Sequence, residues 1–200
     1  MKATWKNFLL IGSIFGMVLT FTGCASVGKS FKYENVPVLN IGSINKEDYQ
    51  KYFGVPSSKT NISNSNGEYL IAKYVYAYAG MGNVDSRVLF LEFKGDGLNG
   101  YVYLSSFDKD RTIADLTKMN RIQKGLTKDQ VVEILGKPTG KSICPSNLMD
   151  FQKDCSTGNE LWIWQSIDFT SSGKKARSAS IQIGFDKEGK VEYSANSKEE

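Results

Sequence analysis

The sequence predicts an α+β fold of two tandem repeats, each a short helix or helix pair packed on a three-stranded antiparallel sheet. One motif occurs twice: residues 45–56 read NKEDYQKYFGVP and residues 127–138 read TKDQVVEILGKP, with the acidic first turn and the Gly-x-Pro end in register. The apolar positions after each copy also correspond, as far as Tyr101 and Tyr193. A repeated helix and its strands indicate a duplicated unit, so a chain of 200 residues is predicted to hold two small domains.

Residues 1–23 are predicted to be a signal peptide. Lys2 and Lys6 precede an apolar run, residues 8–22, that is too short to span a bilayer comfortably. The run ends in LTFTGCAS, which resembles a bacterial lipoprotein signal and implies that Cys24 carries a covalent lipid. Phe21 departs from that pattern, and an ordinary secretory signal or an uncleaved anchor is the alternative.

Residues 24–40 show little periodicity and are predicted to form the lipidated N-terminus and a flexible stalk. The alternative is a segment that folds onto a partner. Two or three acyl chains hold a protein durably on a membrane. Because Asp does not follow Cys24, resemblance to lipoproteins of diderm bacteria implies an outer-membrane location, facing the periplasm.

The first repeat is predicted over residues 41–107. Its helix is expected to start near Asn45, to end at Gly54 and to be stopped by Pro56. The segment that precedes this helix contains Pro37 and is expected to be extended. The β-rich segments that follow, residues 68–78, 88–93 and 101–105, are predicted to form an antiparallel meander.

The second repeat is predicted over residues 112–197. Residues 112–119 are expected to form a short helix, and a second helix is expected to start at Thr127, whose side chain makes a capping box with Gln130. Gly136 supplies the C-cap and Pro138 prevents continuation. Residues 160–169, 180–185 and 190–194 are the three predicted strands.

The sequence contains two further cysteines, Cys144 and Cys155, separated by a short loop that contains Pro, Ser and Asn. In an exported chain this spacing predicts a disulfide, and closing such a loop stabilises the fold by roughly 3 kcal/mol. A redox or metal pair is the alternative, but the chain has no histidine and no Cys-x-x-Cys motif to complete a site. No metal and no cofactor other than the lipid is expected.

The second repeat resembles the SmpA/OmlA (BamE-like) family of outer-membrane lipoproteins. The resemblance rests on Ile122, the string Gly125-Leu126-Thr127, the string LGKP at residues 135–138, and Trp162-Ile163-Trp164. It implies two helices against a three-stranded sheet and a role beside the β-barrel assembly machinery. The tandem of helix-plus-sheet units also resembles, in architecture alone, the secreted β-lactamase inhibitor proteins.

The sequence favours a protein without enzymatic activity. With no histidine a catalytic triad is excluded, and GDGLNG at residues 95–100 leads into a strand, where a dinucleotide-binding motif needs a helix. Matches to Ser-x-x-Lys are as frequent as expected by chance in a chain rich in both residues. The net charge is +4 with lysines interleaved among acids, so no nucleic-acid surface is predicted.

Aromatic side chains are the predicted partner-binding residues. Side chains alternate along a strand, so Trp162 and Trp164 lie on one face and Leu161 and Ile163 on the other. In the first repeat the face equivalent to the tryptophans carries Tyr74, Tyr76 and Tyr78. If the helices cover the Leu and Ile face, the other face is an aromatic stripe suited to binding. The alternative is that these rings are core. Gly125, Leu126 and Thr127 are a second candidate site, or serve only to cap the helix.

Two functions follow from these features. The first is a lipid-tethered periplasmic scaffold or binding module in outer-membrane protein assembly or envelope integrity, whose partner is an envelope protein. The second is a dedicated binder or inhibitor of an envelope or secreted hydrolase.

Overall fold

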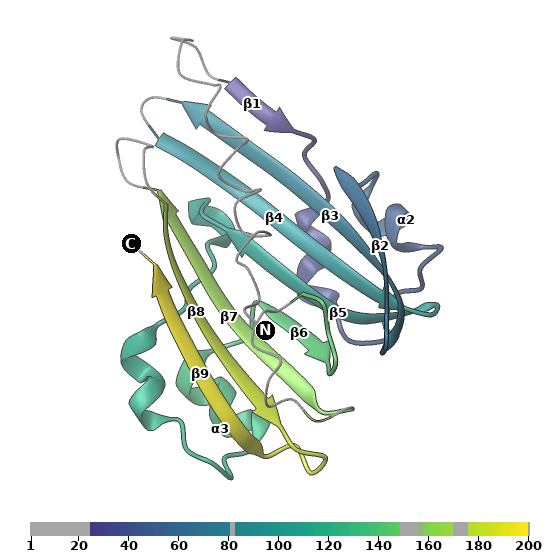
Figure 1. The fold of residues 1–200 in the computed structure, drawn as a ribbon. Helices are drawn as coiled ribbons and strands as arrows, with labels where there is room; N and C mark the ends of the chain where they lie inside the picture. The colour runs from purple at the N-terminus through teal and green to yellow at the C-terminus, as the bar shows by residue number, and fades with distance from the viewer. Residues whose placement is uncertain (1–24, 81–82, 149–155, 157, 170–175, 200) are drawn as a thin grey trace, which may run out of the picture.

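The strands of this protein form one antiparallel sheet. The computed structural model describes residues 25–80, 83–148, 156, 158–169 and 176–199. Nine strands pair in the order β1-β3-β4-β5-β6-β7-β8-β9, with β2 also paired to β3 (Figure 1). They are β1 (Ala25–Gly28), β2 (Ser58–Asn64), β3 (Gly67–Gly80), β4 (Asn83–Lys94), β5 (Gly97–Ser105), β6 (Gly140–Ile143), β7 (Glu160–Phe169), β8 (Ala176–Phe185) and β9 (Val191–Glu199).

The prediction of two separate helix-on-three-strand units is wrong. Five of the six predicted strands lie within β3, β4, β5, β7 and β8, and the sixth overlaps β9 from Val191 onward. However, β6 pairs with β5 on one side and with β7 on the other. This four-residue strand joins the two halves into one sheet. The backbone N–H and C=O groups of β6 are hydrogen-bonded to β5 and β7, so neither half has an unpaired strand edge at this junction.

Glycine allows the close contact at this junction. A Cβ on Gly140 would lie 2.6 Å from the backbone oxygen of Tyr101, and a Cβ on Gly100 would lie 2.6 Å from the Cβ of Ser142. A larger residue at either position would force the strands apart.

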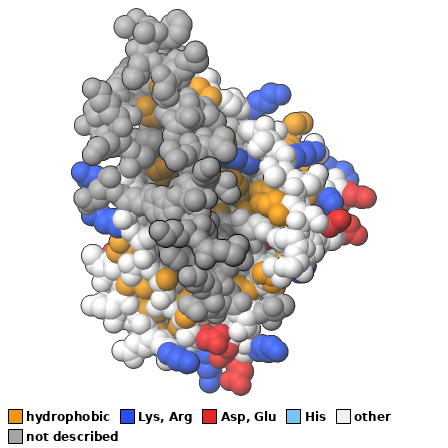
Figure 2. Space-filling model, viewed as in Figure 1, with side chains coloured by type: hydrophobic (Ala, Val, Ile, Leu, Met, Phe, Trp, Pro, Cys, Tyr) orange, Lys and Arg blue, Asp and Glu red, His pale blue; other side chains and the backbone are white. Residues whose placement is uncertain are grey.

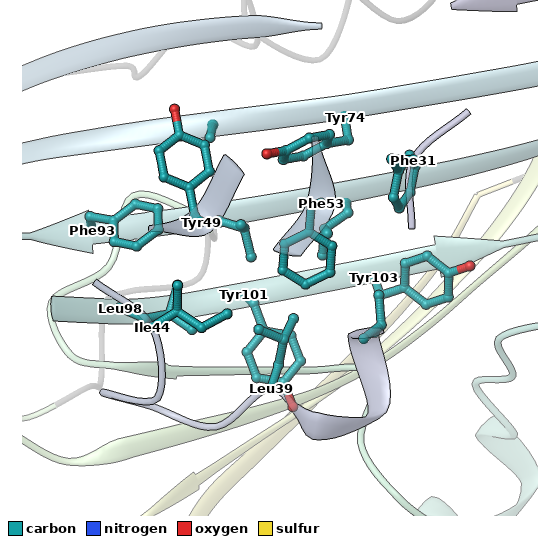
Figure 3. Close-up of a cluster of buried hydrophobic side chains, with 14 of the residues drawn as sticks. Phe31, Leu39, Ile44, Tyr49, Phe53, Tyr74, Phe93, Leu98, Tyr101 and Tyr103 are labelled. Atoms are coloured by element: carbon teal, nitrogen blue, oxygen red, sulfur yellow. The ribbon is translucent and has the colours of Figure 1, made fainter. Parts of the chain in front are cut away.

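In the first half, short helices pack on one face of β3, β4 and β5. They are the 3₁₀ helix η2 (Tyr33–Val38) and the α-helix α2 (Tyr49–Phe53). The segment around Pro37, expected to be extended, is thus helical, and α2 begins four residues later than predicted. Figure 3 shows the rings of Tyr49, Phe53 and Tyr74 gathered between α2 and the strands.

Residues 25–40 belong to this folded half, which differs from the predicted stalk. Residues 25–28 are β1, and Phe31, Val36 and Leu39 are buried in the core with Tyr74. Burying these apolar side chains outweighs the entropy of a free segment.

In the second half, η4 (Leu116–Arg121) and α3 (Lys128–Leu135) pack on β7, β8 and β9, and η3 (Asp108–Asp110) lies between the halves in sequence. The predicted capping box is confirmed: the Gln130 amide N–H donates to Thr127 Oγ1, and the Gln130 side chain accepts from the Thr127 N–H. The buried core of the second half combines one α3 residue with residues of β7, β8 and β9 and two loop residues: Val131, Trp162, Trp164, Ile181, Ile183, Phe185, Val191, Ala114 and Ile122.

Several features recur at equivalent positions of the two halves. The register shifts at Glu92/Phe93 in β4 and again at Gly184/Phe185 in β8. Each helix ends at a glycine with positive φ, Gly54 and Gly136, whose carbonyl accepts a hydrogen bond from a buried ring on the first long strand. The repeated motif in the sequence therefore corresponds to a repeated local structure within one sheet.

Candidate binding surface

The sheet has one face that the helices cover and one that they do not. Leu89, Leu91 and Phe93 pack with the helices, so the alternating residues of β4, Val88 and Phe90, face the other way. Figure 1 shows the helices of both halves behind the sheet. Figure 2 views the molecule from the side opposite the helices. We call the side of the sheet that the described helices leave uncovered the open face.

On the first half, the open face combines apolar side chains with two lysines. Lys73 Nζ lies 5.4 Å from the centroid of the Phe90 ring, and Lys94 Nζ lies 5.3 Å from that of the Tyr69 ring. Among the described residues neither lysine forms an ion pair. The neighbouring open-face residues are Ile71, Val75, Val88 and Leu104.

On the second half, the open face carries polar side chains beside Ile163 and Ile167. Ser180 pairs with Gln165 on β7 and with Ser197 on β9. Gln182 lies two residues further along β8 on the same face. The Ser180 Oγ and Gln182 Oε1 atoms are buried and accept no hydrogen bond within the described ranges.

In the middle of the open face, Glu92 holds the segment after β6 by hydrogen bonds. This fully buried carboxylate accepts hydrogen bonds from Asn99 Nδ2 at 2.7 Å and from the Asn147 backbone N–H at 2.5 Å. It therefore holds the segment after β6 against the sheet, where Leu148 packs on Leu161 and Ile163. Sequence reasoning missed Glu92, although an acid within the apolar run LFLEF was a signal.

Cys144 is buried beside this segment and is disulfide-bonded. Its predicted partner Cys155 lies outside the described residues, as does the predicted lipidation site Cys24. The pairing and the lipid stay predictions.

The two tryptophans predicted to form a binding stripe lie in the core. Trp164 is 1% exposed and Trp162 is 6% exposed, both on the face that α3 covers. The Trp164 Nε1–H donates to the Gly136 carbonyl at 3.1 Å, and the Trp162 Nε1–H donates to Glu160. Alternation separated the two faces correctly, but the helices cover the tryptophan side, and Leu161 and Ile163 are buried on the other face in a separate cluster.

The tyrosines share that covered face. Tyr74 is 1% exposed, its hydroxyl donates to the Gly54 carbonyl, and burial raises its pKa well above the usual range. Tyr76 is half-buried and stacks on Phe107 with the ring centroids 5.9 Å apart. Only Tyr78, at 37%, is exposed among the predicted aromatic residues.

The residues before α3 are hydrogen-bonded to the first residue of β9. The Gly125 N–H donates to the Val191 carbonyl at 2.9 Å, and the Val191 N–H donates to the Leu126 carbonyl at 2.8 Å. Leu126 is half-buried against the core and Thr127 caps the helix. Gly125, Leu126 and Thr127 thus have local structural roles in backbone pairing, core packing and helix capping.

In the first half, a buried ion pair joins Arg87 of β4 to Asp110 of η3. The Arg87 guanidinium donates to both carboxylate oxygens of Asp110, at 2.8 and 2.7 Å, and lies between the rings of Tyr33 and Phe107. The Tyr103 hydroxyl also donates to Asp110. Burial alone would raise the pKa of Asp110, but the hydrogen bonds from Arg87 and Tyr103 outweigh it and lower that pKa.

Comparison with known proteins gave one kind of match. No family model and no curated protein matches the chain, so the resemblance to the SmpA/OmlA family finds no support there. A solved structure from Streptococcus mutans, named "putative beta-lactamase inhibitor protein", is similar with 13% sequence identity and a TM-score of 0.46. The match covers 82% of this chain and 93% of that one.

Among the described residues, no group of acids and cysteines could hold a metal ion. In the same ranges no helix combines the length and the apolar character needed to cross a bilayer.

Proposed function

We propose that this chain is a non-enzymatic, lipid-tethered binding protein of the bacterial envelope that captures a folded protein on the open face of its sheet. The observation that carries the proposal is the arrangement of Lys73 and Lys94 on that face. Each lysine is held over an aromatic ring and has no ion pair among the described residues. A partner with carboxylates beside apolar side chains complements this surface.

We further propose that the partner is a folded envelope or secreted hydrolase, which this chain would bind or inhibit. One continuous sheet, with Glu92 fixing the segment that follows β6, presents its side chains in a defined arrangement before binding. Such a preorganised surface loses little conformational entropy on binding a folded protein.

Site-specific photocrosslinking in the native cells tests the face. A benzophenone amino acid in place of Lys73 is expected to crosslink one envelope protein, and Lys73→Glu together with Lys94→Glu is expected to abolish capture of that protein. Lys59 provides the matched control, because it lies 5.7 Å from the Tyr49 ring on the helix-covered side. A benzophenone at 59 is expected to give no such crosslink, and Lys59→Glu is expected to leave capture unchanged.

The identity of the crosslinked protein tests the class. A hydrolase whose activity falls on titration with the purified chain supports the inhibitor function. A subunit of the barrel-assembly machinery would instead support the scaffold function. Equal crosslinking from positions 73 and 59, or none from either, would contradict the use of the open face.

A further inference from the structure

Strand pairing begins at the residue that directly follows the predicted lipidation site. Strand β1 pairs antiparallel with the C-terminal part of β3, and its first residue, Ala25, is opposite Ala79. Cys24 is the preceding residue. Pairing begins with no intervening spacer residue between the lipid-bearing position and the sheet.

The chain beyond β1 is equally fixed. Phe31 and Leu39 are buried in the first core, and Gly28 fits against the backbone oxygen of Val75, which a Cβ would approach to 2.1 Å. A flexible linker lets a tethered domain move away from the membrane and rotate. The described residues that follow Cys24 provide no such linker.

This end of the sheet carries side chains suited to a lipid surface. Val27 is 41% exposed on β1 and Tyr78 is 37% exposed on β3, on the two opposite faces of the sheet, because Val27 pairs with Ala77 and Tyr78 pairs with Ser26. Tyrosine is favoured at membrane interfaces, where its ring contacts acyl chains and its hydroxyl remains hydrated. Lys29 and Lys32, which follow β1, are exposed and would contact anionic headgroups.

We propose that the end of the sheet formed by β1 and the C-terminal part of β3 lies on the membrane, with the acyl chains of Cys24 entering the bilayer beside Val27 and Tyr78. The inference rests on the proposed lipid tether. Strand β4 then runs away from the membrane over twelve residues, which at about 3.4 Å each places Lys94 roughly 40 Å from its start. The acid-binding lysine is thereby presented at the far end of the sheet.

Lysine footprinting of the full, lipidated protein tests this orientation. The protein is reconstituted on vesicles of phosphatidylethanolamine and phosphatidylglycerol and acetylated, and each lysine is quantified by mass spectrometry. Lys29 and Lys32 are expected to react severalfold more slowly than in the Cys24→Ser protein mixed with the same vesicles, while Lys94 reacts at an unchanged rate.

A spacer distinguishes orientation from mere tethering. Ten Gly and Ser residues inserted between Cys24 and Ala25 are expected to restore the reactivity of Lys29, whereas the same residues appended after Glu200 leave it protected. Acylated Cys24 with equal reactivity of Lys29 and Lys94 would overturn the orientation and leave the tether standing. Unacylated Cys24 in the wild-type protein would overturn both, and neither result bears on capture at Lys73.

Discussion

At the scale of single residues, the ion pair of Arg87 and Asp110 shows how a buried charge is tolerated. Side chains of the two residues are 10% and 15% exposed, and Arg87 is enclosed by the rings of Tyr33 and Phe107. Arg87 donates to both carboxylate oxygens of Asp110, and the Tyr103 hydroxyl donates a further hydrogen bond. These bonds replace the water that the carboxylate loses on burial. This pair connects η3 to β4.

Replacing Asp110 by Asn is expected to reduce the free energy of unfolding by about 3 kcal/mol at pH 7, because it leaves Arg87 buried without a counter-charge. The folded-state pKa of Asp110 lies below its unfolded value. Its contribution is therefore present above about pH 4 and is lost as the pH falls through the folded-state pKa. Urea unfolding from pH 7 to pH 2.5 should show the gap between the two proteins closing at acid pH.

Asp108→Asn is the matched control, since Asp108 pairs with Arg111 at the surface with a side chain that is 96% exposed. That change is expected to matter little at any pH. A pH-independent gap for Asp110→Asn, or an effect no larger than that of Asp108→Asn, would contradict the assignment.

At the scale of elements, the sequence predicts the long strands and α3 well and the short elements poorly. Strand β6 has only the residues GKSI and no apolar alternation, so its pairing with β5 and β7 depends on partners distant in sequence. The same limit applies to the aromatic residues. Alternation assigns Trp164 and Ile163 to opposite faces, but which face the helices cover depends on tertiary packing.

Packing of β9 on β8 depends on a glycine. A Cβ on Gly184 would lie 1.9 Å from Cε1 of the Tyr193 ring, which lies across the glycine on the open face. We expect Gly184→Ala to lower the free energy of unfolding by about 2 kcal/mol, because the ring must move from a packed position. In a Tyr193→Ala background the same change should cost much less. Equal costs in both backgrounds, measured by urea unfolding, would show that the ring is not the obstacle.

At the scale of the whole molecule, the continuity of the sheet makes the two halves one cooperative unit. Backbone pairing runs without interruption from β3 to β9, and the core residues Val102 and Ile163 meet across β6 on the open face. Neither half ends at a free sheet edge at this junction. We therefore expect a single unfolding transition, although the repeated motif alone predicts two domains.

Gly140→Ala tests that coupling. The new Cβ would lie 2.6 Å from the Tyr101 oxygen and 3.0 Å from the Val102 Cα, both backbone atoms that cannot move without separating β5 from β6. Trp162 and Trp164 report on the second half, so their fluorescence and the far-UV circular dichroism should change together in the wild type and separate in Gly140→Ala. Gly97→Ala is the control, because nothing lies within 4 Å of its added Cβ. If the fluorescence and circular dichroism transitions of Gly140→Ala still coincide, at the same unfolding midpoint as in the wild type, β6 does not couple the halves.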